Sequence, residues 1–219
     1  MKISQTIRRK KSHPLVSILL AAIALGGTIM LMPNADAKLF DGPVDKLPVL
    51  ERAALRDGQV SLQGEKGQYT GRILVKSSMD TAWQVLTDYN NFEKFLPEVE
   101  NSELVEANGD RKVFEQINKI RVFLFNKESR IRIAVQESYP QQIDFKIVDG
   151  DLETLDGKWR LEAVSPYPSA PPDKVLITHQ VEVEPGSIIS KSMFFDIYEN
   201  SLKDTLAAIK QEAEQRNVN

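Results

Sequence analysis

Apolar and polar residues alternate along most of the chain after residue 67. The first regular run, YTGRILVKS, is rich in β-branched residues and predicts a strand over residues 68–76. Turn signals, most of them containing glycine or proline, separate the further strand-like runs, and only polar residues separate the second run from the third. These runs are 102–107, 112–125, 130–137, 143–148, 157–163 and 174–183. Because strands joined by short turns pair as antiparallel neighbours, the pattern predicts one curved antiparallel sheet of about seven strands.

Other segments show the spacing of helices. A short helix is predicted around Trp83, capped by Ser78 or Asp80. The chain breaks at 89–91 and continues as a second short helix that ends before Pro97. A long helix with one apolar face is predicted over residues 190–215, and at about 1.5 Å per residue it reaches roughly 39 Å, enough to cover a curved sheet. These elements together predict an α+β fold.

Two stretches of this pattern resemble a known family. The segments VKSSMDTAWQVLTDYNNFEKFLPEVENSELVE and FKIVDGDLETLDGKWRLE are similar to the polyketide cyclase/dehydrase family, within the START-like (SRPBCC) superfamily that includes coenzyme Q-binding START proteins. The resemblance covers residues 68–211 and implies a START-like ligand-binding domain over 67–215, after an N-terminal lead-in over 38–66. It also implies the helix-grip fold, in which the long C-terminal helix closes a cavity on the sheet.

Strand alternation and the implied fold give a set of candidate cavity residues. They are Phe92, Phe95, Ile131, Ile133, Phe145, Trp159, His179, Met193, Phe194 and Ile197. Pockets for apolar ligands are lined in this way, with few polar groups to set orientation. A fully packed core would need the same residue types, so the composition alone leaves both readings open. The resemblance favours the cavity.

The first 37 residues have the features of a secretory signal. A basic cluster, Arg8 to Lys11, precedes an apolar run from Leu15 to Met32 and a small-x-small site ending at Ala37. We therefore expect export to a periplasmic or lumenal compartment, with cleavage after Ala37. The alternative is an uncleaved membrane anchor.

Charge and composition restrict the ligands and reactions that we expect of this domain. Without residues 1–37, which carry a net charge of +4, the formal charge changes from −3 to −7, so the domain has no electrostatic attraction to nucleic acid. The chain has no cysteine, and His179 is the single histidine after the signal, so we expect no metal site, no cofactor and no catalytic residue. The acidic residues Asp149, Asp151 and Glu153 are interpreted as solvated turn charges.

The basic residues Lys119, Arg121, Arg130 and Arg132 allow two readings. They either ring the cavity and touch anionic lipid, or lie on the outward face of two neighbouring strands. The sequence therefore favours an exported carrier for a hydrophobic small molecule, a lipid or an isoprenoid quinone, with possible contact to a membrane surface. A cyclase/dehydrase-like enzyme acting on a hydrophobic chain and a protein-interaction module are the alternatives.

Overall fold

The computed structural model describes residues 41–122, 125–186 and 190–218. The chain from Lys38 to Asn219 forms one compact unit. The predicted signal, residues 1–37, and its cleavage site lie outside the described residues. Within the described residues, no helix combines the length and the hydropathy needed to cross a membrane.

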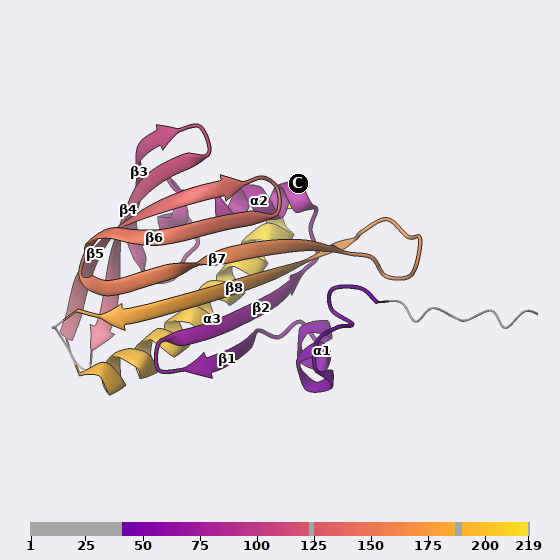
Figure 1. Cartoon of the computed structure of the whole chain (residues 1–219), viewed down its shortest axis with the longest axis horizontal. Coiled ribbons are helices and arrows are strands. Elements are labelled where there is room, and N and C mark those ends of the chain that lie inside the picture. Colours follow the sequence, from indigo (N-terminus) through magenta and orange to yellow (C-terminus); the bar gives the residue numbers. More distant parts are fainter. Residues whose placement is uncertain (1–40, 123–124, 187–189, 219) are drawn as a thin grey trace, which may run out of the picture. The chain divides into compact units, whose positions relative to one another are not determined.

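The described strands form one antiparallel sheet in the order β1-β2-β8-β7-β6-β5-β4-β3 (Figure 1). Their bounds are β1 Ser61–Glu65, β2 Gln68–Val75, β3 Val99–Asn108, β4 Arg111–Val122, β5 Phe125–Ser138, β6 Gln142–Gly150, β7 Leu152–Val164 and β8 Lys174–Pro185. Strands that are consecutive in sequence are neighbours in the sheet, except β2 and β3, because β2 pairs with β8. The predicted α+β fold with a curved antiparallel sheet is confirmed.

Strand β1 lies in the segment 38–66, which the sequence predicts to be an N-terminal lead-in. It was missed because SLQGE contains one apolar residue and a glycine, which is the pattern of an exposed edge strand. A two-residue turn, Lys66-Gly67, joins β1 to β2, and both residues have positive φ, as a tight hairpin of this kind requires. The described sheet therefore has eight strands where about seven were expected from the spacing of turn signals.

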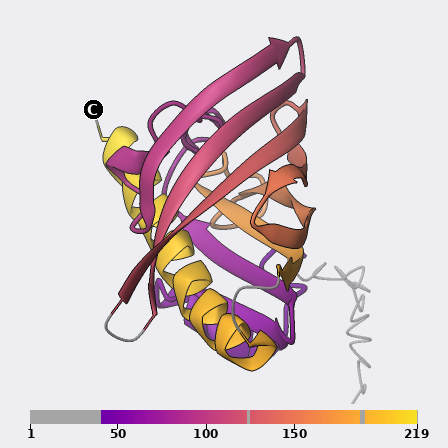
Figure 2. The same ribbon diagram turned by 90° about the vertical axis from the view of Figure 1, so that its left-hand side faces the viewer.

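Helices cover both faces of the sheet. The short helix α2, Met79–Leu86, is capped by the Ser78 hydroxyl, which accepts a hydrogen bond from the Thr81 amide at 3.0 Å. The 3₁₀ helix η1, Phe92–Lys94, follows the predicted break. The long helix α3, Lys191–Arg216, crosses the inner side of the sheet (Figure 2).

The carboxyl end of α3 is fixed to the segment around α2. The Lys76 amide donates to the Glu214 carboxylate at 3.0 Å, and the Ser78 amide donates to the Asn217 side chain at the same distance. On the inner face, Leu206 of α3 lies so close to Gly71 of β2 that an added Cβ would come within 2.4 Å of the leucine methyl group. Glycine at this position therefore lets the helix approach the sheet.

The N-terminal segment packs on the outer face of the same sheet. Helix α1, Val49–Arg56, places Leu55 against Leu74 and Leu176 in a second, smaller core. The buried carboxylate of Glu51 accepts hydrogen bonds from Ser61, Gln63 and Arg72. The segment 41–66 is therefore part of the folded unit.

Candidate ligand-binding cavity

A cavity of about 240 Å³ lies between the inner face of the sheet and helix α3. Most of its lining is apolar, with Val135, Ile143 and Leu155 from the sheet and Leu202 and Ile209 from α3. Its volume is just below the range of about 300–1,000 Å³ that is typical of small-molecule sites. The cavity therefore fits a compact apolar molecule, or one end of a longer one.

Aromatic side chains close the cavity beside α2 and η1. The rings of Tyr89 and Phe114 stack at 4.8 Å, and Phe92 meets Phe114 edge to face at 5.7 Å. The Tyr89 hydroxyl donates a hydrogen bond to Glu137 at 2.8 Å, and Lys112 pairs with the same carboxylate. Burial, together with the hydrogen bond to Glu137, raises the pKa of Tyr89, so the phenol remains a neutral donor.

His179 forms part of the wall on strand β8. Its imidazole lies 3.9 Å from the Trp159 ring and 5.4 Å from the Phe145 ring, measured between centroids. The residue is 5% exposed, and within the described part of the chain its Nδ1 has no hydrogen-bond partner. Burial lowers the pKa of His179 to about 3, so the imidazole is neutral at physiological pH.

Polar side chains line another part of the cavity. Asn118 of β4 and Ser129 of β5 are paired directly across the two strands. Ser201 of α3 donates a hydrogen bond to the carboxylate of Glu98, in the segment that leads into β3. This contact ties the long helix to the opposite side of the cavity.

Most of the residues expected at the cavity do line it. They are Phe92, Ile131, Ile133, Phe145, Trp159, His179 and Phe194. Phe95, Met193 and Ile197 are not among the lining residues. Phe95 packs beneath the guanidinium of Arg216, 5.6 Å from its ring centroid, and against Phe92.

Helical geometry explains the other two positions. Successive residues of an α-helix are about 100° apart, and the stripe that lines the cavity follows Phe194, Tyr198, Leu202, Thr205 and Ile209. Met193 and Ile197 lie to one side of this stripe and are half-buried. The apolar pattern identified the helix but not the centre of its inward face.

Several lining residues were missed by the sequence analysis. They include Tyr89, Glu98, Phe114, Gln116, Asn118 and Tyr198. The signal for those in β4 was the alternation of Phe114, Gln116 and Asn118, but the polar side chains at two of these positions concealed an inward face. The signal of Tyr198 is weaker than that of Ile197 beside it, which is the more apolar residue.

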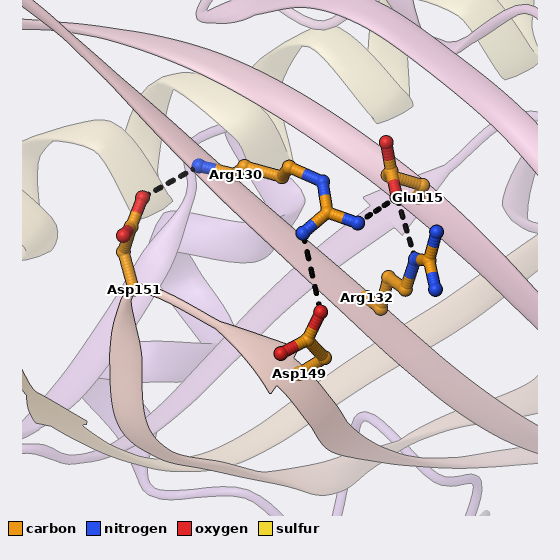
Figure 3. Close-up of polar contacts among 5 residues, drawn as sticks. All are labelled: Glu115, Arg130, Arg132, Asp149 and Asp151. Carbon is orange, nitrogen blue, oxygen red and sulfur yellow. Dashed lines mark hydrogen bonds and ion pairs between the residues drawn. The ribbon is translucent and has the colours of Figure 1, made fainter.

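Arg130 and Arg132 of β5 lie away from the cavity. Figure 3 shows Arg130 and Arg132 both bound to Glu115 of β4, each at 2.6 Å, with Arg130 also 3.1 Å from Asp149. Hydrogen bonds from both arginines lower the pKa of Glu115 to about 2, so this carboxylate remains charged at ordinary pH. The outward-face reading is correct for Arg130 and Arg132.

Neighbouring charges are also paired. Lys119 pairs with Glu100, and the Asp151 carboxylate accepts a hydrogen bond from the Arg130 amide at 2.8 Å. Asp149 and Asp151 are thus partners of Arg130, where the sequence suggested solvated charges. Within the described residues, no group of three or more acidic or histidine side chains could hold a metal ion.

The depressed pKa of His179 predicts how stability depends on pH. An unfolded histidine has a pKa near 6.5, so below that pH the unfolded chain binds a proton that the folded chain excludes. Stability should therefore fall as the pH drops from about 6.5 towards about 3. Between pH 7 and pH 5 we expect the wild type to lose about 2 kcal/mol more than His179→Gln, measured by urea unfolding of both proteins. Equal pH dependence in the two proteins would contradict the buried neutral imidazole.

Comparison with known proteins places the chain in a family. The family model described as polyketide cyclase/dehydrase and lipid transport matches residues 75–210. The chain belongs to this family. The matched segment covers α2, η1, the six strands β3 to β8 and most of α3, and these elements supply the residues that line the cavity.

Solved structures of similar fold include START-domain proteins and an aromatase/cyclase. A START superfamily protein from Mycobacterium smegmatis has a TM-score of 0.56 at 16% identity, covering 70% of this chain and 99% of that one. A STAR-related lipid transfer protein from Xanthomonas axonopodis has a TM-score of 0.56 at 20% identity, covering 71% and 93%. The Zhui aromatase/cyclase from a Streptomyces species has a TM-score of 0.55 at 15% identity, covering 71% and 96%.

At these identities the likeness establishes the helix-grip fold alone. No curated protein matches the chain. This member of the polyketide cyclase/dehydrase and lipid transport family therefore has a START-like architecture, and what it binds depends on the residues of its own cavity.

Proposed function

We propose that this protein is an exported carrier that binds a hydrophobic small molecule, a lipid or an isoprenoid quinone, in the cavity under α3. The observation that supports this function is the apolar cavity of about 240 Å³ enclosed by the sheet and the long helix. Each 100 Å² of apolar ligand surface buried there contributes about 2.5 kcal/mol to binding. This burial supplies the affinity without any reaction.

The titratable groups at the cavity support carriage over acid–base catalysis. A catalytic acid or base works best when its pKa lies near the working pH, but burial lowers the pKa of His179 to about 3. Tyr89 and Tyr198 have pKa values raised by burial, so both phenols stay protonated. None of these side chains is poised to exchange a proton at neutral pH.

A cyclase/dehydrase-like enzyme is the second candidate. It is favoured by the imidazole in the cavity wall and by the fold shared with the Zhui aromatase/cyclase. An enzyme that used His179 for proton transfer would lose activity by more than about a hundredfold in His179→Gln while remaining folded. The carrier should retain its biological function in the same variant.

The carrier function is tested by identifying what the protein holds when it is purified. The protein is purified in the form that the cell produces and is then extracted with organic solvent. Mass spectrometry of the extract should detect a lipid or quinone in stoichiometric amount. A protein of the same compartment purified by the same steps is the control for carry-over. An extract with no enriched apolar molecule, together with no binding of added lipid or quinone, would contradict the proposal.

Export makes a separate prediction. The basic and apolar pattern of residues 1–37 should lead to removal of this segment, so N-terminal sequencing of the protein should begin at Lys38. The protein should be recovered from a periplasmic or lumenal fraction, where an apolar carrier would meet a membrane surface. Retention of residues 1–37 in a membrane fraction would favour the anchored alternative.

A further inference from the structure

The imidazole of His179 is held in a fixed orientation by three neighbouring strands. Trp159 of β7 is paired directly with His179 of β8, and Phe145 of β6 lies over the imidazole at an interplanar angle of 15°. The two aromatic side chains cover the ring, so contact with a cavity ligand is left to its edge. A polar group fixed in this way binds a partner without losing further side-chain freedom.

Gly157 makes this arrangement possible. It lies on β7 opposite Phe145, and an added Cβ would come within 2.7 Å of the Phe145 ring and 2.1 Å of the Gln180 carbonyl oxygen. Any larger residue would therefore push Phe145 off its place over His179. The sequence Asp156-Gly157-Lys158-Trp159 thus provides both the gap and one of the two aromatic neighbours.

The imidazole has an unused capacity for hydrogen bonding. His179 lines the cavity, is 5% exposed, and its Nδ1 has no partner among the described residues. A buried polar atom without a partner is unfavourable, so buried polar groups are usually satisfied by protein, water or ligand. A polar atom of the ligand would therefore gain most binding free energy from a hydrogen bond at this position.

The charges of the lining indicate which polar atom fits. Among the described lining residues there is no lysine or arginine, and the one ionisable carboxylate is that of Glu98. A carboxylate or phosphate of a ligand would lose its hydration here and meet no positive charge. The neutral imidazole can instead donate to, or accept from, an uncharged oxygen.

We infer that the edge of His179 binds an uncharged hydroxyl or carbonyl oxygen of the ligand, so the cavity selects neutral oxygen-bearing apolar molecules over hydrocarbons and anions. This inference rests on the proposed carrier function and specifies the ligand class. Phe145 and Trp159 act as positioning residues that hold the imidazole in place.

Matched small probes test the inference. They are propylbenzene, 1-phenyl-1-propanol, propiophenone and 3-phenylpropanoate, each measured at neutral pH by displacement of the uncharged dye N-phenyl-1-naphthylamine. In His179→Leu the alcohol and the ketone should bind about 2- to 10-fold more weakly, while propylbenzene binds as well as before or better. The carboxylate should bind most weakly to the wild type.

Two further variants separate recognition from structure. His179→Gln retains a hydrogen-bonding side chain and should restore part of the affinity for the alcohol and the ketone. Thr178→Val removes a buried hydroxyl from the residue beside His179 on β8, at nearly constant shape and outside the cavity lining, and should leave the order of the four probes unchanged. If His179→Leu does not fold, His179→Gln gives the same comparison with a smaller expected change.

The possible outcomes distinguish a failure of this inference from a failure of the proposed carrier function. An equal change for hydrocarbon and oxygen-bearing probes, or tightest binding of the carboxylate, would overturn the role of His179 and leave the carrier function standing. Failure of the dye and of all four probes to bind the wild type would overturn both.

Discussion

Thr205→Trp should abolish the binding of apolar ligands while leaving the domain folded. Thr205 lies on α3 and lines the cavity, between Leu202 and Ile209 on the same stripe of the helix. An indole at this position would occupy a large part of the volume of about 240 Å³. We expect affinity for the neutral dye N-phenyl-1-naphthylamine to fall by more than a hundredfold, since the ligand and the indole need the same space.

The free energy of unfolding of Thr205→Trp shows whether the cavity is open. Overpacking a filled core costs about 1–3 kcal/mol, whereas an indole entering empty space costs little or adds stability by burying apolar surface. Urea unfolding of Thr205→Trp should therefore give a free energy within about 1 kcal/mol of the wild type. A strongly destabilised variant would mean that the side chains around Thr205 fill this space themselves.

Ile197→Trp is the matched control on the same helix. Ile197 is half-buried but does not line the cavity, so an indole there should leave dye binding within about twofold of the wild type. Loss of binding in Ile197→Trp with normal binding in Thr205→Trp would show that the ligand lies on another side of α3.

The contrast between these two positions shows what the sequence could predict. The apolar pattern identified α3 to within one residue at each end, because helix periodicity is a local property. Which part of an apolar face points into a cavity depends on how the helix is rotated against the sheet. That rotation is fixed by distant contacts, such as Leu206 on Gly71, which local periodicity does not contain.

Most of the sheet was predictable because strand alternation, like helix periodicity, is a local property of the sequence. The edge strand β1 was not predictable. Alternation identified each strand that has a buried face, including β8 with its run of buried Val175, Ile177 and His179. Strand β1 has no buried residue, so alternation gave no signal for it. Its place in the fold depends on pairing with β2 and on the contacts of α1, and neither leaves a hydrophobic pattern in its own residues.

The polar contacts on the outward face of the sheet were the least predictable part. Pairing of Arg130 with Glu115 and Asp149 joins residues on three strands, so it could be read only from the strand register. The sequence offered two readings of the basic residues because alternation does not say which face of the sheet is covered by α3. The cavity residues of β5, β6 and β8 were correctly predicted because each of these strands has one apolar face, and that face points inward.

The second large effect that we expect is on stability, from Arg72→Met on the outer face of the sheet. The guanidinium of Arg72 lies 2.6 Å from the Glu51 carboxylate, whose side chain is 3% exposed. Ser61 and Gln63 each donate a hydrogen bond to the same carboxylate at 3.0 Å, but neither carries a charge. Methionine keeps most of the aliphatic bulk of arginine, so the substitution removes mainly the positive charge.

Removing the cation leaves a buried carboxylate without charge compensation, which costs about 3–5 kcal/mol in comparable sites. We expect the free energy of unfolding, measured in urea, to fall by this amount. The carboxylate of Glu51 can regain contact with water only if α1 separates from the sheet. Glu51→Gln added to Arg72→Met should restore much of the loss, because the amide keeps hydrogen-bonding atoms and removes the stranded charge. The control is Lys203→Met, which breaks an exposed pair with Glu199 and should cost less than about 0.5 kcal/mol. If Arg72→Met costs no more than Lys203→Met, the network around Glu51 does not hold α1 on the sheet, and the N-terminal segment is attached chiefly by the apolar contacts of Leu55 with Leu74 and Leu176.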